Sequence, residues 1–255
     1  MNLACVRGLS RKGANEEVQV LLEGKSAVIY GAGGSIGGAV SRAFAREGAR
    51  VLLAGRTEAK LDAVAEQIRS AGGVAETTQL DALDEAAVDE HADAVVAKAG
   101  SLDISFNLIS HDYVQGTPMA EMELDDYLQP VTSAVRTTFL TWRAAARHMA
   151  RQGSGVILAF GGEGHPVRGY YLGALQVALH AIESMRRQLA SELGAHGVRV
   201  VTLRTGECPS PSPRACSRGL PSRQESNRRP CSGAPRRWRT RVRWPRSWPP
   251  TALAP

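Results

Sequence analysis

Residues 26–57 read SAVIYGAGGSIGGAVSRAFAREGARVLLAGRT, and this stretch decides the fold. A short apolar run at 27–29 ends at a glycine-rich turn, as expected of a parallel strand that is buried on both faces. Apolar residues then recur at helical spacing from Ile36 to Phe44, and a second apolar run follows at 51–54. The order strand, glycine-rich turn, helix, strand is typical of a dinucleotide-binding βαβ unit.

The turn carries glycines at GxxGxxG spacing, at Gly31, Gly34 and Gly37. Glycine lets the backbone turn tightly and approach a pyrophosphate, and the helix that begins there directs its positive end at the phosphates. A purely structural turn is the alternative, which the flanking βαβ order disfavours. The predicted phosphate-binding residues are Gly31, Gly33, Gly34, Ser35, Ile36 and Gly37.

The residues after the second strand distinguish the two nicotinamide coenzymes. An acidic residue there would accept hydrogen bonds from a free ribose 2′-hydroxyl, whereas a basic one accommodates a 2′-phosphate. This chain has Arg56, whose planar guanidinium suits a phosphate monoester, followed by the hydroxyl of Thr57. We therefore expect NADP(H) rather than NAD(H). The alternative is that Arg56 is only a solvated loop residue.

Three further motifs follow in a fixed order: LDA at 80–82, DISFNLIS at 103–110 and LASELGAHGVRVVTLR at 189–204. Together with the glycine turn, they make residues 24–206 resemble the short-chain dehydrogenase/reductase family. The resemblance implies an α/β fold, a single-domain Rossmann-like doubly wound parallel sheet. It also implies an oxidoreductase that transfers a hydride between NADP(H) and a small-molecule carbonyl or alcohol.

The same resemblance assigns further residues and a partner. It puts Asp81 and Ala82 beside the adenine, and it matches Asn107 to the first asparagine of the family's DILVNNAG strand. Two long helical patterns, at 125–151 and 172–195, correspond to family helices that pair across a dimer axis, which implies a homo-oligomer. In the first of them we expect an apolar stripe to face the core, made of Val131, Val135, Phe139, Trp142, Ala146 and Met149.

The catalytic residues of the family are missing at their expected places. Members use a serine after the fifth strand, a tyrosine as general acid or base, and a lysine four residues later that lowers the tyrosine pKa. Here the strand at 156–160 runs into glycines without a serine, and the tyrosine and lysine positions fall at Leu175 and Leu179. The nearest tyrosines, Tyr170 and Tyr171, have no lysine four residues on.

Two interpretations of this departure stay open. Hydride transfer needs an oriented coenzyme and substrate, so an atypical site still suits an activated substrate. Its proton would then come from Tyr171 or Tyr170, or from His111, Glu163 or His165, although histidine is often partly exposed without a function. The second interpretation is a catalytically inactive dinucleotide-binding protein or scaffold.

Residues 207–255 differ from the rest in composition. They contain eleven arginines and ten prolines but no lysine, aspartate, isoleucine, phenylalanine or tyrosine. Such a segment buries too little apolar surface to offset the entropy of ordering it, so we expect a disordered tail. The net charge is −3 up to residue 206 and +9 after it, which together give the +6 of the chain.

We hypothesise a change of reading frame near residue 206, which would leave the sheet without its last strand. Arginines that alternate with Trp238, Trp244 and Trp248 also suit nucleic acid, an interpretation that we rank below the frame change. The polar segment at 1–23 reads as an N-terminal extension rather than a signal peptide, and no stretch reaches membrane-spanning length. We expect a cytoplasmic protein with no membrane partner and, from its cysteine spacing, no metal site.

Overall fold

A computed structural model describes residues 20–161 and 171–204 of the chain. Within these residues, six parallel strands form one sheet in the order β3-β2-β1-β4-β5-β6. The strands are β1 (Ser26–Tyr30), β2 (Arg50–Gly55), β3 (Val74–Gln79), β4 (Ile104–Asn107), β5 (Gly155–Gly161) and β6 (Val198–Arg204). The strand order reverses between β1 and β4, which confirms the predicted doubly wound Rossmann-like sheet.

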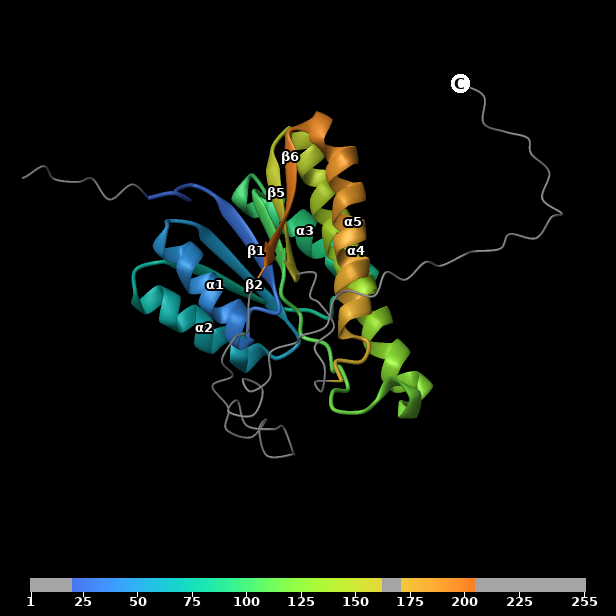
Figure 1. Cartoon of the computed structure of the whole chain (residues 1–255). Helices are drawn as coiled ribbons and strands as arrows, with labels where there is room; N and C mark the ends of the chain where they lie inside the picture. The colour runs from blue at the N-terminus through green and yellow to red at the C-terminus, as the bar shows by residue number, and fades with distance from the viewer. Residues whose placement is uncertain (1–19, 162–170, 205–255) are drawn as a thin grey trace, which may run out of the picture. The chain divides into compact units, whose positions relative to one another are not determined.

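Helices cover both faces of this sheet (Figure 1). On one face lie α1 (Ser35–Arg46) and α2 (Glu58–Ser70). On the other lie α3 (Glu85–Ala99), α4 (Leu124–Gln152) and α5 (Leu175–Leu193). Two short 3-10 helices, η1 (Met119–Glu121) and η2 (Gly194–His196), lie in the connections before α4 and after α5. Strands that alternate with covering helices are buried on both faces, which is why β1 is apolar throughout its centre.

Helix α4 buries half of its predicted apolar stripe in the core, and Val131 and Val135 are partly exposed. Trp142 and Met149 are buried in the cluster between the sheet and α3, α4 and α5. Phe139 is an exception, because 51% of its surface is exposed and the Arg143 guanidinium lies 5.7 Å from its ring centre. Phe139 thus belongs to the outer side of the helix, and the expectation that it packs into the core is wrong.

The strand β6 forms one edge of the sheet within the described residues. Val198 and Val200 point into the core beside α5, so the alternating residues Val201 and Leu203 point to the other face. These two side chains are 46% and 44% exposed. The predicted loss of the last strand and the disordered tail fall on residues 205–255, outside the described part, so they stay predictions, as do the domain bounds at 24 and 206.

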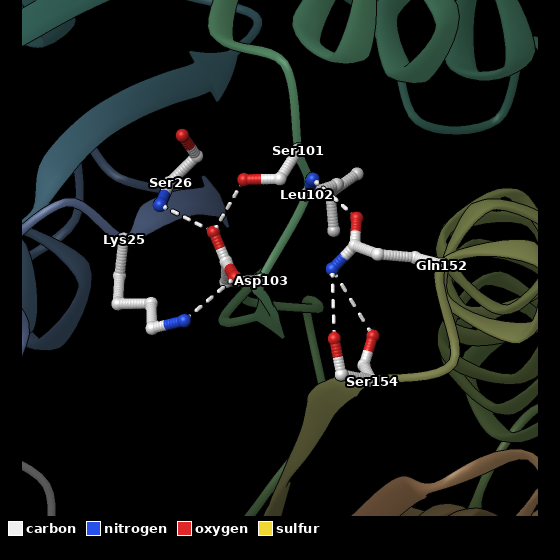
Figure 2. Close-up of polar contacts among 7 residues, drawn as sticks. All are labelled: Lys25, Ser26, Ser101, Leu102, Asp103, Gln152 and Ser154. Atoms are coloured by element: carbon white, nitrogen blue, oxygen red, sulfur yellow. Dashed lines mark hydrogen bonds and ion pairs between the residues drawn. The ribbon is translucent and has the colours of Figure 1, made fainter.

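A buried carboxylate ties the strands together at the amino ends of the sheet (Figure 2). Asp103 accepts hydrogen bonds from the Ser26 backbone N–H at 2.9 Å, the Ser101 hydroxyl at 2.7 Å and the Lys25 ammonium at 3.2 Å. Burial by itself would raise the pKa of Asp103, but these donors together hold it below its ordinary value. The Asp103 carbonyl also accepts from the Val156 N–H, at 2.8 Å, so one residue joins β1, β4 and β5.

The side chain of Gln152 closes the same end of the molecule (Figure 2). It accepts a hydrogen bond from the Leu102 N–H at 3.3 Å and donates to the Ser154 carbonyl at 3.2 Å. The end of α4 is thereby held against the start of β4 and β5. These contacts join the amino ends of β1, β4 and β5. In doubly wound sheets ligands bind at the opposite, carboxyl ends of the strands, so a site is expected there.

None of the helices within residues 20–161 and 171–204 combines the length and the apolar character needed to cross a bilayer. Within the same residues, no three histidine, cysteine, aspartate or glutamate side chains lie close enough together to hold a metal ion.

Candidate functional site

The glycine turn after β1 is held in place by backbone contacts. The Gly31 N–H donates to the Ala54 carbonyl at 2.8 Å, and the Gly34 N–H donates to the Gly31 carbonyl at 3.1 Å. Gly31 has a φ of +77°, and a Cβ there would lie 2.6 Å from the Leu108 carbonyl oxygen. Both the backbone conformation of residue 31 and the close approach of the segment after β4 therefore require glycine at this position.

Helix α1 begins inside this turn and is packed directly on it. Gly34 precedes the first helical residue, and no side chain caps the helix there. The first backbone bond of the helix runs from the Gly38 N–H to the Gly34 carbonyl, at 2.8 Å. The N–H groups of Ser35 to Gly37 precede it and have no helical carbonyl to pair with, so this end offers an anion three donors and the positive end of the helix dipole.

A cavity of about 360 Å³ opens beside the turn, at the carboxyl ends of the strands. The loops that follow β1, β2, β3 and β4 all contribute to its wall. The predicted coenzyme residues in this wall are Gly31, Gly33, Gly34, Arg56, Thr57, Asp81 and Ala82. The structure thus brings together the glycine turn, the expected 2′-phosphate pair and the expected adenine pair, which are spread over fifty residues of sequence.

The remaining predicted coenzyme residues lie elsewhere. Ile36 and Asn107 line a second cavity of about 270 Å³. Ser35 and Gly37 lie in the first turn of α1 and line neither cavity. Gly37 instead packs against the Gly31 carbonyl oxygen, with which a Cβ at residue 37 would overlap.

Arg56 lies exposed in the wall of the first cavity. Its backbone carbonyl accepts a hydrogen bond from the Gln79 side chain at 3.0 Å, which fixes the loop after β2. Its guanidinium makes no hydrogen bond or ion pair within residues 20–161 and 171–204, so its donors are available to a ligand. Lys60 lines the same cavity one helical turn further on, and a Cβ at Gly33 would lie 2.8 Å from its Cβ. Lys60 is not among the residues predicted from the sequence, although it comes three residues after Thr57, the N-cap of α2.

The two cavities meet at the segment 108–111, all four residues of which line both. Most of the remaining wall of the second cavity is apolar, and its large apolar side chains are Ile36, Trp142, Phe160, Leu175, Leu179 and Ile182. Leu175 and Leu179, where the resemblance leads us to expect the family's tyrosine and lysine, both lie in this wall. A Cβ at Gly161 would lie 2.9 Å from the Leu179 Cδ2 atom, so the end of β5 abuts this leucine.

Asn107 is the last residue of β4 and lines the second cavity. Its amide oxygen accepts from the Ile109 N–H at 3.0 Å, and its amide nitrogen donates to the Thr141 hydroxyl at 3.2 Å. Both bonds hold the chain in a turn as it leaves the sheet. The strand ends at Asn107.

Of the two predicted catalytic tyrosines, only Tyr171 lies within the described residues. Tyr171 is 49% exposed and lines neither cavity, and its carbonyl accepts from the Gly116 N–H at 3.1 Å. Tyr170, with Glu163 and His165, lies outside the described residues. A catalytic role for Tyr171 or Tyr170 therefore stays a prediction.

A polar pair that the sequence analysis did not connect lies where the cavities meet. The Nδ1 atom of His111 is 3.2 Å from the Ser133 hydroxyl oxygen, and its ring makes an edge contact with Tyr113 at 6.0 Å. Burial is the main cause that lowers the pKa of His111, opposed by Asp112 and reinforced by Arg56. Burial also raises the pKa of Tyr113 to about 12.

Comparison with known proteins gives consistent matches. The sequence model of a family described as "Enoyl-(Acyl carrier protein) reductase" matches residues 31–240. The chain is 30% identical to D-threitol dehydrogenase of Mycolicibacterium smegmatis over 71% of its own length and 69% of that protein. It is 34% identical to the short-chain reductase protein NovJ of Streptomyces niveus over 78% of its own length and 74% of that protein.

Two solved structures are similar in fold. One is a metagenomic short-chain oxidoreductase in complex with NADP, with a TM-score of 0.66 and 28% identity over 73% of this chain and 84% of the other. The second is an NAD⁺-bound xylitol dehydrogenase, with a TM-score of 0.66 and 25% identity over 72% of this chain and 71% of the other.

Proposed function

Because the chain belongs to the short-chain dehydrogenase/reductase family and is an oxidoreductase by that membership, we propose that it transfers a hydride between NADP(H) and a small carbonyl or alcohol. The surroundings of Arg56 favour NADP(H) over NAD(H). The exposed guanidinium of Arg56 shares a cavity with the glycine turn and has no acidic partner there within the described residues. A 2′-phosphate in this cavity would find a planar fork of donors.

The residues present fit such a coenzyme. Gly31 and Gly37 are positions where a Cβ would fill the space that the backbone needs, so the turn stays close to the start of α1. The N–H groups of Ser35 to Gly37 would hold the pyrophosphate, Arg56 and Thr57 the 2′-phosphate. Asp81 and Ala82 would lie beside the adenine, and Ile36 and Asn107 beside the nicotinamide half.

When bound, the nicotinamide supplies or accepts the hydride. The chain contributes orientation and an apolar second cavity that keeps water away from the reacting atoms. With leucine at 175 and 179, the site is an atypical one, and its proton must come from another side chain. The catalytically inactive alternative predicts coenzyme binding without turnover, so an activity assay distinguishes the two.

A homo-oligomer is part of the proposal. The exposed apolar side chains Phe139 on α4 and Val177 on α5 support an association through these helices, because each would lose its water-exposed surface. The cytoplasmic location stays a prediction from the sequence.

The coenzyme preference is tested by Arg56→Asp. Loss of the charged donors, and repulsion between the new carboxylate and the 2′-phosphate, is expected to raise the Kd for NADPH about 10- to 100-fold, because a hydrogen bond to a charged group contributes about 1.5–3 kcal/mol. NADH lacks the 2′-phosphate, so its Kd should change by less than about threefold. Fluorescence titration measures both.

The matched control is Arg199→Asp, which makes the same charge change at an exposed position of β6. It should leave both Kd values unchanged. Equal losses for NADPH and NADH in Arg56→Asp, or no loss for either, would contradict the assignment of Arg56.

A further inference from the structure

Among the residues 108–111, which line both cavities, His111 is the one with an ionisable side chain. It follows β4 by four residues and lies on the segment that separates the expected coenzyme cavity from the apolar one. A group at this junction can reach a ligand that extends from one cavity into the other. The large side chains on the far wall of the apolar cavity, from α5, are aliphatic and offer no proton.

The hydroxyl of Ser133 contacts the imidazole ring of His111. The serine comes from the early part of α4, and its hydroxyl lies 3.2 Å from Nδ1 of His111. If Nδ1–H donates to this hydroxyl, Nε2 carries a free lone pair, which makes it a proton acceptor. The Tyr113 ring packs edge-on against the imidazole, with an angle of 77° between the two ring planes.

We propose that His111 is the catalytic residue that exchanges a proton with the substrate oxygen, and that Ser133 is a positioning residue that sets its tautomer. This inference rests on the proposed function, because it concerns the same two cavities. It replaces the tyrosine of the family with a histidine that approaches from the β4 side instead of the α5 side.

In the oxidation of an alcohol, the O–H bond of the substrate breaks and its proton passes to Nε2 of His111, while the O–H electron pair forms the second bond of the carbonyl. The hydrogen on the carbon that bears this oxygen leaves with its electron pair, as a hydride, to the oxidised coenzyme, so the alcohol is oxidised and the coenzyme is reduced. In the opposite direction the imidazolium returns the proton to the oxygen.

The charges around His111 determine the pH at which it works. Asp112 on its own segment, Arg56 on the loop after β2 and Tyr113 face it, and Lys60 and Asp81 line the first cavity. The lowered pKa keeps the ring neutral at pH 7, the state that accepts a proton. Alcohol oxidation should therefore lose rate as the pH falls through the pKa of His111, and carbonyl reduction should lose rate as the pH rises through it.

The decisive variant is His111→Asn, compared with His196→Asn at an exposed position of η2. The probes are 1-phenylethanol with NADP⁺ and 4-nitrobenzaldehyde with NADPH, whose apolar rings suit the second cavity. We expect His111→Asn to lower kcat by about 100-fold or more, with the Kd for NADPH changed less than about threefold. The acid limb of the oxidation profile should disappear with the histidine, and free imidazole should restore part of the rate to His111→Ala. His196→Asn should match the wild type.

A second readout needs no coenzyme. The ¹⁵N chemical shifts of the His111 ring in the free protein should report a proton on Nδ1, and Ser133→Ala should shift the ring toward the other tautomer. A ring whose tautomer is the same in both proteins overturns the role of Ser133.

The remaining outcomes separate this inference from the proposed function. Turnover that His111→Asn preserves overturns the catalytic role of His111. NADPH binding without turnover of either probe rejects that role too and leaves the coenzyme proposal standing. Failure of NADPH to bind at all rejects the proposed function itself, and the inference with it.

Discussion

Replacement of Gly37 by valine is expected to raise the Kd for NADPH by more than about 100-fold and to destabilise the protein. A Cβ at residue 37 would overlap the Gly31 carbonyl oxygen and lie 2.9 Å from the Gly31 carbonyl carbon and the Ala32 Cα. All three are backbone atoms, so no side chain can rotate away to relieve the overlap. Helix α1 must move off the turn, and the N–H groups that meet the phosphates move with it.

The expected loss of stability follows from the same contact. Forcing extra carbon atoms into a closely packed site costs about 1–3 kcal/mol of the free energy of unfolding. Gly194→Val is the control, because Gly194 has a φ of −57° and nothing lies within 4 Å of its added Cβ. Urea unfolding and calorimetric titration measure the two effects. A Gly37→Val protein that binds NADPH like the wild type would refute the geometry of the turn.

Acid is expected to destabilise the fold through His91 on α3. This side chain is only 7% exposed and both of its ring nitrogens lack a hydrogen-bond partner within the described residues. Burial lowers its pKa from 6.5 to about 4. Between those pH values the unfolded chain binds a proton that the folded protein does not, so the free energy of unfolding falls as the pH drops from 6.5 toward 4.

The full effect is roughly 3 kcal/mol, since each pKa unit corresponds to about 1.36 kcal/mol. His91→Phe removes the titrating group and keeps a ring against Tyr30, with which His91 makes an edge contact at 5.9 Å. Denaturant unfolding of both proteins from pH 8 to pH 4 should give a shallower decline for His91→Phe. Parallel curves would show that His91 does not titrate in this way.

Much of the fold could be predicted from the sequence because its signals are local. The segment 26–57 carries an apolar run, a glycine turn and a helical stripe, and the structure has β1, α1 and β2 in that order. Helix α5 begins at Leu175 instead of 172, because Tyr171 and Gly173 have φ values of +44° and +54° that a right-handed helix excludes.

The presence of Arg56 and Asp81 in one cavity wall was predictable for the same reason, since Arg56 follows β2 directly and Asp81 follows β3 after one intervening residue. The contact between His111 and Ser133 was not, because it joins residues twenty-two positions apart on a loop and a helix with no shared pattern. Phe139 shows the limit of a helical stripe: spacing indicates that one face is apolar, but not how far around the helix the neighbouring elements reach.

The most direct test of the central claim is calorimetric titration of the full chain with NADPH and with NADH. The amides at the start of α1 and the guanidinium of Arg56 predict saturable binding of NADPH, at least about tenfold tighter than that of NADH. Folded protein that binds neither coenzyme, or that prefers NADH, would contradict the account.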